Sequence, residues 1–317
     1  METKLLSDGK VWVGVLLAAA AATAGITYAA DKAGRSSCGE CAAWNEPHKP
    51  FKIFGDTYYV GTAQLTSILI ATEFGHVLID GALPESAPQI KANIEALGFK
   101  LEDVKAILNS HTHPDHAGGI AELQKLSGAD VYALRPAYEV LSTGKLNRED
   151  PQAARKGPAI APVSRLWIAQ DDQQLGVANV RLRAIATPGH TPGGTTWTWD
   201  SCEGAKCLRM VYADSLSPVA ADKYRFSDHP EVVQQFESSF GRIAALPCEV
   251  LLTPHPAQSQ LFERLDTGKE NTDAIRDPEG CKKYVQGARE ALAKRLETEK
   301  TGKKPVAGQP ARDACVE

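Results

Sequence analysis

Three histidines and an aspartate crowd into one short stretch of the chain, and no hydrophobic core requires such a group. His111, His113, Asp115 and His116 fall within residues 109–119. His111 and His113 are two positions apart, so in an extended segment their side chains leave the same face. Asp115 and His116 follow a proline and point in another direction. Imidazole and carboxylate side chains in this pattern predict two neighbouring zinc sites.

Two more histidines, His190 and His255, follow apolar runs that predict strands. Five of the eight histidines therefore lie in motifs that could bind a metal. A histidine triad with an open fourth position is typical of catalytic zinc, which lowers the pKa of bound water to about 7. A second ion close by would hold a substrate anion and stabilise a leaving group, so the site suggests hydrolysis of a carbonyl compound. The expected ligand sets are His111, His113 and His190 for the first zinc ion, and Asp115, His116 and His255 for the second.

The elements that must position these residues alternate as in an α/β protein. Apolar runs predict strands and longer periodic segments predict helices. We expect one domain over residues 51–300, built as a sandwich of two sheets with helices outside, in four layers of αββα order. Residues 135–162 read as a long irregular loop that could cover the metals. The predicted strands are 51–54, 57–60, 66–71, 75–81, 104–108, 130–134, 166–168, 177–186, 195–199, 208–213 and 251–252, and the helices are 88–97, 117–126, 231–246 and 282–299.

The two ends of the chain do not read as parts of this domain. In residues 1–30, Lys4 and Lys10 precede the apolar run 11–22, and small residues follow as far as Ala30, which is typical of a secretory signal peptide. The apolar run is shorter than the roughly 20 residues of a membrane-spanning helix. We therefore expect a cleaved leader and a periplasmic or secreted protein, with an uncleaved membrane anchor as the alternative. A polar N-terminal arm at 31–50 and a flexible tail at 301–317 complete the chain.

Composition narrows the class of partner. The chain has 317 residues, a net charge of -4 and 23% charged residues, which is ordinary for a globular protein. Without a basic stripe, nucleic acid and anionic membranes are not expected partners. We expect a small-molecule substrate, no stable membrane anchor and a monomer.

Seven cysteines agree with export to an oxidising compartment. Cys202 and Cys207 bracket a hairpin-like turn that a short disulfide could clamp. Cys248 and Cys281 could close a loop worth roughly 3 to 4 kcal/mol in the chain-entropy model. The sequence assigns no pairing to the remaining three, Cys38, Cys41 and Cys315. As an alternative to a disulfide, Cys38 and Cys41 could form half of a zinc knuckle.

Taken together, these motifs resemble the metallo-β-lactamase superfamily over residues of about 51–285. The motifs that carry the resemblance are His-x-His-x-Asp-His at 111–116, Pro-Gly-His-Thr at 188–191, Val-Leu-Ile-Asp-Gly at 77–81 and the late His255. Within the superfamily the chain is similar to the third subclass of zinc β-lactamases, whose second zinc is held by Asp, His and His. The amino-acid sequence is also similar to that subclass at 193–199, 213–217, 246–248 and 253–256.

The resemblance implies a zinc-dependent β-lactamase that opens penicillins, cephalosporins and carbapenems and confers antibiotic resistance. A zinc-bound hydroxide would attack the β-lactam carbonyl, with Asp115 orienting the hydroxide, and a second zinc would receive the departing nitrogen. Ser215, Ser217 and Gln152 would orient the substrate carboxylate. Asp80 and Thr112 would orient the metal-binding side chains without binding the metal themselves.

One pair of neighbouring residues separates the branches of the superfamily. In its glyoxalase-like and lactonase-like members an aspartate bridges both metals from the strand end that holds Ser215 here. Asp214 lies one residue earlier, and strand alternation allows only one of the two to face the metals. The spacing does not decide between them, whereas the resemblance favours Ser215.

Three alternatives to a β-lactamase use the same residues. A glyoxalase-type thioester hydrolase or an acyl-lactonase would have the same five histidines, but such enzymes are usually cytosolic and need neither disulfides nor a leader. A nuclease of the superfamily fits poorly with a net charge of -4. A zinc-binding protein without catalysis would be expected to lack one of the ligands.

Overall fold

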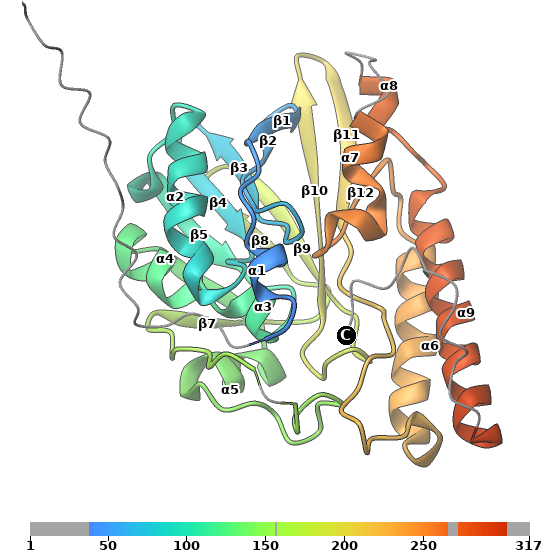
Figure 1. Cartoon of the computed structure of the whole chain (residues 1–317). Coiled ribbons are helices and arrows are strands. Elements are labelled where there is room, and N and C mark those ends of the chain that lie inside the picture. Colours follow the sequence, from blue (N-terminus) through green and yellow to red (C-terminus); the bar gives the residue numbers. More distant parts are fainter. Residues whose placement is uncertain (1–37, 156, 266–271, 303–317) are drawn as a thin grey trace, which may run out of the picture. The chain divides into compact units, whose positions relative to one another are not determined.

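Two β-sheets form the centre of the fold, and helices lie outside them (Figure 1). The computed structural model describes residues 38–155, 157–265 and 272–302. The predicted leader, 1–30, and residues 303–317 of the predicted tail lie outside the described residues.

The first sheet has seven strands that follow one another in sequence order. Its first four strands pair antiparallel, and the pairs from the fourth strand to the seventh are parallel. The carboxyl ends of the last four strands therefore meet at one edge of the sheet. The strands are β1 (Phe51–Phe54), β2 (Thr57–Tyr59), β3 (Ile68–Thr72), β4 (Gly75–Ile79), β5 (Val104–Leu108), β6 (Asp130–Leu134) and β7 (Leu166–Ala169).

The second sheet has five strands in the order β12-β11-β10-β9-β8. β11 and β12 are parallel, whereas β8, β9, β10 and β11 pair antiparallel in turn. The carboxyl ends of β9, β11 and β12 therefore share one edge. The strands are β8 (Gln174–Val177), β9 (Val180–Ala186), β10 (Thr195–Glu203), β11 (Lys206–Tyr212) and β12 (Val250–Leu252).

Alternating side chains divide the core into three parts. In β11, Met210 and Tyr212 belong to the cluster between the sheets, which also contains Val77 and Ile79 of β4. The intervening Val211 belongs to a separate cluster on the outer face of the second sheet. A third cluster lies outside the first sheet. Three cores require four layers, so the predicted αββα sandwich is confirmed.

The longer helices cover the outer faces of the sheets. α2, α4 and α5 lie over the first sheet, and α6 and α9 lie side by side over the second (Figure 1). Within the described residues, no helix is both long and apolar enough to span a bilayer. The helices are α1 (Cys41–Trp44), α2 (Ala87–Ala96), α3 (Pro114–Ala117), α4 (Ile120–Ser127), α5 (Arg135–Thr143), α6 (Pro230–Ala244), α7 (Leu261–Leu265), α8 (Thr272–Ile275) and α9 (Gly280–Thr301), with 3₁₀ turns at Pro84–Ser86, Leu101–Asp103, Phe226–Asp228 and Pro256–Ser259.

One helix falls where the sequence predicted an irregular segment. α5 occupies the start of 135–162, and its buried residues Ala137, Val140 and Leu141 recur at helical spacing. A proline stands in its first turn, where the missing N–H costs nothing. Gly144 then ends the helix in the left-handed conformation, with φ of 71°. The expectation of a loop was wrong for this part, because the proline and the closing Ser-Thr-Gly resemble loop composition.

The predicted strand 177–186 contains the end of β8, a turn and the whole of β9. β8 ends at Val177 and β9 begins at Val180, and the two intervening residues have positive φ, 47° at Ala178 and 67° at Asn179. Such a two-residue turn matches the right-handed twist of paired strands. Its sequence, Ala-Asn, lacks the glycine by which these turns are usually identified. The strand prediction was therefore right for 180–186 and wrong for the turn.

Part of the segment predicted as a loose arm belongs to the fold. Residues 41–44 form α1, and Thr62 Oγ1 donates a hydrogen bond to the Trp44 carbonyl at 2.5 Å. Ser86 Oγ lies 2.6 Å from Asn45 Oδ1. The expectation of poor order therefore fails for residues 38–50.

Three disulfides join six of the cysteines. The structure pairs Cys202 with Cys207 and Cys248 with Cys281, as expected from the sequence. Cys38 pairs with Cys41, so in this structure the two sulfurs bind each other and not a zinc ion. Cys315 lies outside the described residues.

Candidate metal centre

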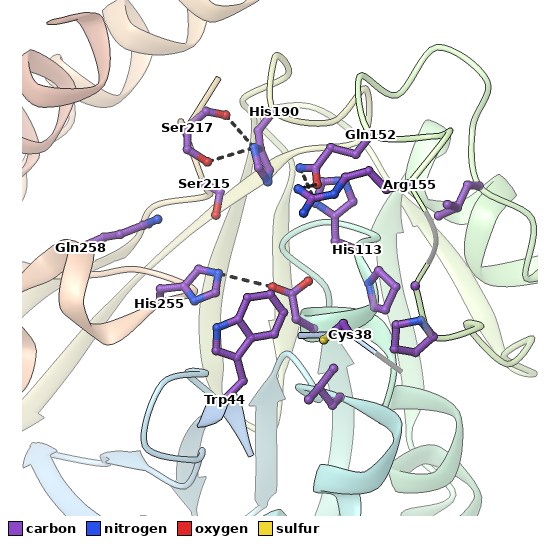
Figure 2. Close-up of a pocket in the computed structure, with 16 residues that line it drawn as sticks. Cys38, Trp44, His113, Gln152, Arg155, His190, Ser215, Ser217, His255 and Gln258 are labelled. Carbon is purple, nitrogen blue, oxygen red and sulfur yellow. Dashed lines mark hydrogen bonds and ion pairs between the residues drawn. The ribbon is translucent and has the colours of Figure 1, made fainter. Parts of the chain in front are cut away.

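The predicted ligands come together where strands of both sheets end. Figure 2 shows three of them, His113, His190 and His255. His111 and His113 follow β5, and α3 carries the next two ligands. His190 follows β9, and His255 follows β12. The two sheets are joined here, since Trp197 Nε1 of β10 donates to the Asn109 carbonyl at 3.0 Å.

Asp80 supports the loop that carries the first histidines. Its carboxylate accepts hydrogen bonds from Ser110 N at 2.7 Å, Ser110 Oγ at 2.6 Å and Tyr212 OH at 2.8 Å. Its own backbone is strained, with φ of 61°, and such strain is typical of functional sites. Asp80 therefore acts through Ser110, one residue before His111. Thr112 is buried between the two histidines, and its supporting role stays a prediction.

A glycine allows α3 and α4 to approach the end of β4. A Cβ on Gly119 would lie 2.2 Å from the carbonyl oxygen of Gly81, so no larger residue fits without displacing the backbone. The predicted helix 117–126 corresponds to α4, which begins at Ile120, and the short α3 before it carries Asp115 and His116.

The first predicted ligand set forms one buried cluster. One ligand atom from each of His111, His113 and His190 lies within 4.8 Å of the others. The ring centroids are 4.9 Å apart for His111 and His113, 4.9 Å for His111 and His190, and 4.8 Å for His113 and His190. The spacing of two residues and the late histidine at 190 therefore converge as expected.

Each of these rings is held through one nitrogen, which leaves the other for a metal. Nδ1 of His111 lies 2.8 Å from Asp214 Oδ1, and Nδ1 of His190 lies 2.8 Å from the Ser217 carbonyl. In His113 the held nitrogen is Nε2, 3.1 and 3.2 Å from the two oxygens of Asp150. Carboxylate and carbonyl partners of this kind fix the tautomer and the orientation of metal-binding imidazoles.

Burial sets the charge of the first cluster. It lowers the pKa of His111 well below its usual range, with the neighbouring histidines adding to the effect, and lowers the pKa of His190 to about 3. Burial likewise raises the pKa of Asp214 well above its usual range. Neutral imidazole is the form that binds metal.

The second cluster differs in part from the predicted one. His111, Asp115 and His116 bring their ligand atoms together, and His255 lies at the edge of this group. Asp115 Oδ2 is 3.0 Å from His116 Nε2 and 3.4 Å from His255 Nε2. Nδ1 of His255 is held 3.2 Å from the Gln64 carbonyl. Burial by itself would raise the pKa of Asp115, but His116 and His255 outweigh it and hold the pKa well below its usual range.

The donor set fits zinc. Nε2 of His111 and Nδ1 of His116 are buried with no hydrogen-bond partner among the described residues, and buried polar atoms rarely lack one. Nitrogen and carboxylate oxygen are the donors that zinc takes in catalytic sites. The cluster is therefore a metal site rather than a hydrogen-bonded polar core.

A pocket opens onto the cluster, and its walls come from distant segments (Figure 2). Ser215 lies in one wall, whereas Asp214 points away from it towards His111. A Cβ on Gly194 would lie 2.4 Å from Asp214 Oδ2, so glycine makes room for the carboxylate behind the site. The sequence left open whether Asp214 or Ser215 faces the pocket, and in the structure it is Ser215. Ser217 and Gln152, both predicted to bind substrate, also line the pocket.

Several residues of the site were not predicted from the sequence. Asp150, which contacts His113, lies in the predicted loop two residues before the expected Gln152, and that short separation was the available signal. Arg155 lines the opposite wall from Ser215. Trp44, whose ring centroid is 5.8 Å from that of His255, and Gln258 had no signal in their local sequence.

Comparison with known proteins identifies the family. The metallo-beta-lactamase superfamily model matches residues 60–204. A hydroxyacylglutathione hydrolase of Albidiferax ferrireducens is 30% identical over 52% of this chain and 52% of its own length. An N-acyl homoserine lactonase of Bacillus cereus is 28% identical over 39% of this chain and 54% of its own length. The chain thus spans about half the length of the curated relatives that it matches.

Solved structures match over a larger part of the chain. Rm3 metallo-beta-lactamase is 49% identical, covering 83% of this chain and 99% of its own, with a TM-score of 0.80. MEM-A1, a subclass B3 metallo-beta-lactamase from a soil metagenome library, is 44% identical, covering 82% and 100%, with a TM-score of 0.79. SMB-1, solved with mercaptoacetic acid, is 41% identical, covering 81% and 99%, with a TM-score of 0.78. The chain therefore belongs to the metallo-beta-lactamase superfamily and is a hydrolase with a metal site rich in histidine.

Proposed function

We propose that this protein is an exported β-lactamase that opens the β-lactam amide bond of penicillins, cephalosporins and carbapenems and so confers antibiotic resistance. The observation that carries the proposal is the position of Ser215 in the pocket wall, with Asp214 turned behind the cluster. A hydroxyl at this position supplies no carboxylate to bridge two metals, as thioester hydrolases and lactonases of the superfamily would require. The similarity to solved metallo-beta-lactamases supports the same substrate class.

Two zinc ions held by the clusters would lower the pKa of a water molecule and polarise the amide carbonyl. His111, His113 and His190 would hold the first ion, and Asp115, His116 and His255 the second. Asp115 is ionised, and Oδ2 faces His116 and His255. Its other oxygen is left to orient the attacking water and to take its proton.

The pocket walls would bind the carboxylate that β-lactam antibiotics carry. The Ser215 and Ser217 hydroxyls stand on one side, and Gln152 and Arg155 on the other. Arg155 Nη1 donates to Gln152 Oε1 at 3.1 Å, which keeps a cation beside the amide. Together these groups would orient the scissile bond towards Asp115.

Export is supported by the disulfides, which persist in oxidising compartments and are rare in the cytosol. A periplasmic or secreted location and a monomeric state are part of the proposal.

The proposal is tested by hydrolysis of a chromogenic cephalosporin and a carbapenem by the purified protein, with and without a chelator. A glutathione thioester and an acyl homoserine lactone are the parallel substrates, because the curated relatives bear those activities in their names. β-Lactam opening that a chelator abolishes and added zinc restores is the expected result. Cleavage of the thioester or the lactone with no β-lactam opening would contradict it and favour that branch of the superfamily.

A further inference from the structure

The segment 147–155 touches both ring nitrogens of His113. Asp150 is 4% exposed, and its two carboxylate oxygens lie 3.2 and 3.1 Å from Nε2. On the other side of the ring, Gln152 Nε2 lies 3.5 Å from Nδ1, the nitrogen left for a metal. The loop 147–155 therefore contacts the His113 ring on both sides, through Asp150 at Nε2 and through Gln152 at Nδ1.

The same carboxylate organises the loop itself. Gln152 N donates to Asp150 Oδ1 at 2.7 Å, and Ala153 N donates to the Asp150 carbonyl at 2.9 Å. One turn later, Arg155 N donates to the Gln152 carbonyl at 2.8 Å. Asp150 is thus at once the first residue of a hydrogen-bonded turn and the partner of His113.

The turn is also fastened to the opposite wall of the pocket. Ala221 N, in the segment that follows Ser217, donates to the Pro151 carbonyl at 2.9 Å. Because Gln152 and Arg155 both line the pocket, a shift of Asp150 would carry these two side chains with it. The ordering of this wall thus depends on what Asp150 binds.

A metal ion bound at Nδ1 withdraws electron density from the imidazole, so Nε2–H becomes a stronger donor to a carboxylate. The hydrogen bond to Asp150 should therefore strengthen when the ion binds. We propose that Asp150 is a positioning residue that couples the first metal site to the loop 147–155, so that metal binding orders the Gln152 and Arg155 wall of the pocket. By linkage, the ordered loop raises metal affinity by the same factor. The inference holds whichever acyl compound is the substrate.

The first test needs no substitution. Amide hydrogen exchange is measured on the purified protein with and without zinc, in peptides that cover 147–155. The amides of Gln152, Ala153 and Arg155 are expected to exchange more slowly with zinc bound, while peptides of the turn between β8 and β9, at the end of β9 opposite to His190, stay unchanged. Unchanged exchange over 147–155 would overturn the coupling.

The second test compares Asp150→Asn with Glu149→Gln. Both remove one carboxylate charge from neighbouring positions, but Glu149 is exposed. In competition with a chelator, Asp150→Asn is expected to bind zinc roughly 10 to 100 times more weakly, as for other partners of metal-binding histidines. It should also lose the zinc-dependent slowing of exchange and shift the visible spectrum of the Co²⁺-loaded protein. Glu149→Gln should match the unsubstituted chain in all three.

Two outcomes would refute the proposal by different routes. Wild-type zinc affinity in Asp150→Asn would show that Asp150 does not position His113. Weaker zinc binding with the zinc-dependent slowing intact would make Asp150 a support for His113 alone, without coupling to the loop. Since no β-lactam enters these measurements, they stand apart from the test of the proposed substrate.

Discussion

Asp214 Oδ1 lies 2.8 Å from His111 Nδ1, although 103 positions separate the two residues in the chain. The contact turns the Asp214 carboxylate away from the pocket and places the neighbouring Ser215 in the pocket wall. One hydrogen bond therefore orients the His111 imidazole and also decides which of the two side chains faces the pocket.

Replacing Asp214 by Asn should weaken zinc binding by roughly 10-fold or more, because the amide keeps the shape but loses the carboxyl group that orients the imidazole. Competition with a chromogenic chelator measures the affinity, and thermal unfolding checks that the variant is folded. Asp172→Asn, at an exposed carboxylate paired with Arg183, is the matched control. A folded Asp214→Asn variant with wild-type affinity would contradict the role given to this contact.

Replacing Ser215 by Ala should raise KM for a β-lactam about 10-fold, since a hydrogen bond to a charged group contributes about 1.5 kcal/mol or more. The turnover number should change little, because the hydroxyl orients the carboxylate and takes no part in bond breaking. Steady-state kinetics on a cephalosporin and on its methyl ester separate the two effects. Ser142→Ala, on the exposed surface of α5, serves as the control. An equal effect on acid and ester would argue against carboxylate binding at this wall.

Two of the disulfides should stabilise the fold to different extents. Cys248 and Cys281 are 33 positions apart, whereas Cys202 and Cys207 are 5 apart. In the chain-entropy model, replacing the first pair by alanines should lower the free energy of unfolding by roughly 3 to 4 kcal/mol, and replacing the second pair by about 2 kcal/mol. Chemical denaturation of the two double variants provides the comparison. A larger loss for the short loop would contradict the entropic account.

Glu299 should make part of the stability depend on pH. Its carboxylate accepts from Phe226 N at 3.1 Å, Ser227 N at 2.8 Å and Arg295 Nε at 2.6 Å. Burial opposes ionisation, but Arg295 and the backbone donors outweigh it and lower the pKa below its ordinary value of 4.5. The stabilisation is therefore present above about pH 4.5 and is lost as the pH falls through the lower pKa of the folded state.

Glu299→Gln should accordingly lower the free energy of unfolding at pH 7 by about 1 to 2 kcal/mol, in the range for hydrogen bonds to charged groups. The difference from the unsubstituted protein should shrink as the pH falls below 4.5. Urea denaturation at several pH values from 7 to 3.5 measures it, with Glu297→Gln on the same helix as control. A difference that stays constant over this range would contradict the assignment.

Much of the fold could be read from local patterns. The strands β5 and β6 begin and end where apolar runs predicted, because an apolar run of this length between polar turns is too short for a typical helix and favours a buried strand. The hairpin at Ala178 and Asn179 was missed because its turn lacks the usual glycine. The helix at 135–143 was missed because the proline in its first turn and the Ser-Thr-Gly at its end, although compatible with helix ends, are equally common in loops.

The sequence by itself predicted a metal site and the histidines that would build it, because His111 and His113 lie close together in any extended segment and strand ends bring His190 to them. Only the tertiary structure decided which nitrogen of His111, His113 and His190 is left for a metal, that Ser215 and not Asp214 faces the pocket, and that Asp150 and Trp44 lie beside the cluster. The physical reason is distance along the chain. Asp150 and Trp44 reach the cluster only when sheets and loops pack, and no spacing in the local sequence encodes contacts between such remote segments.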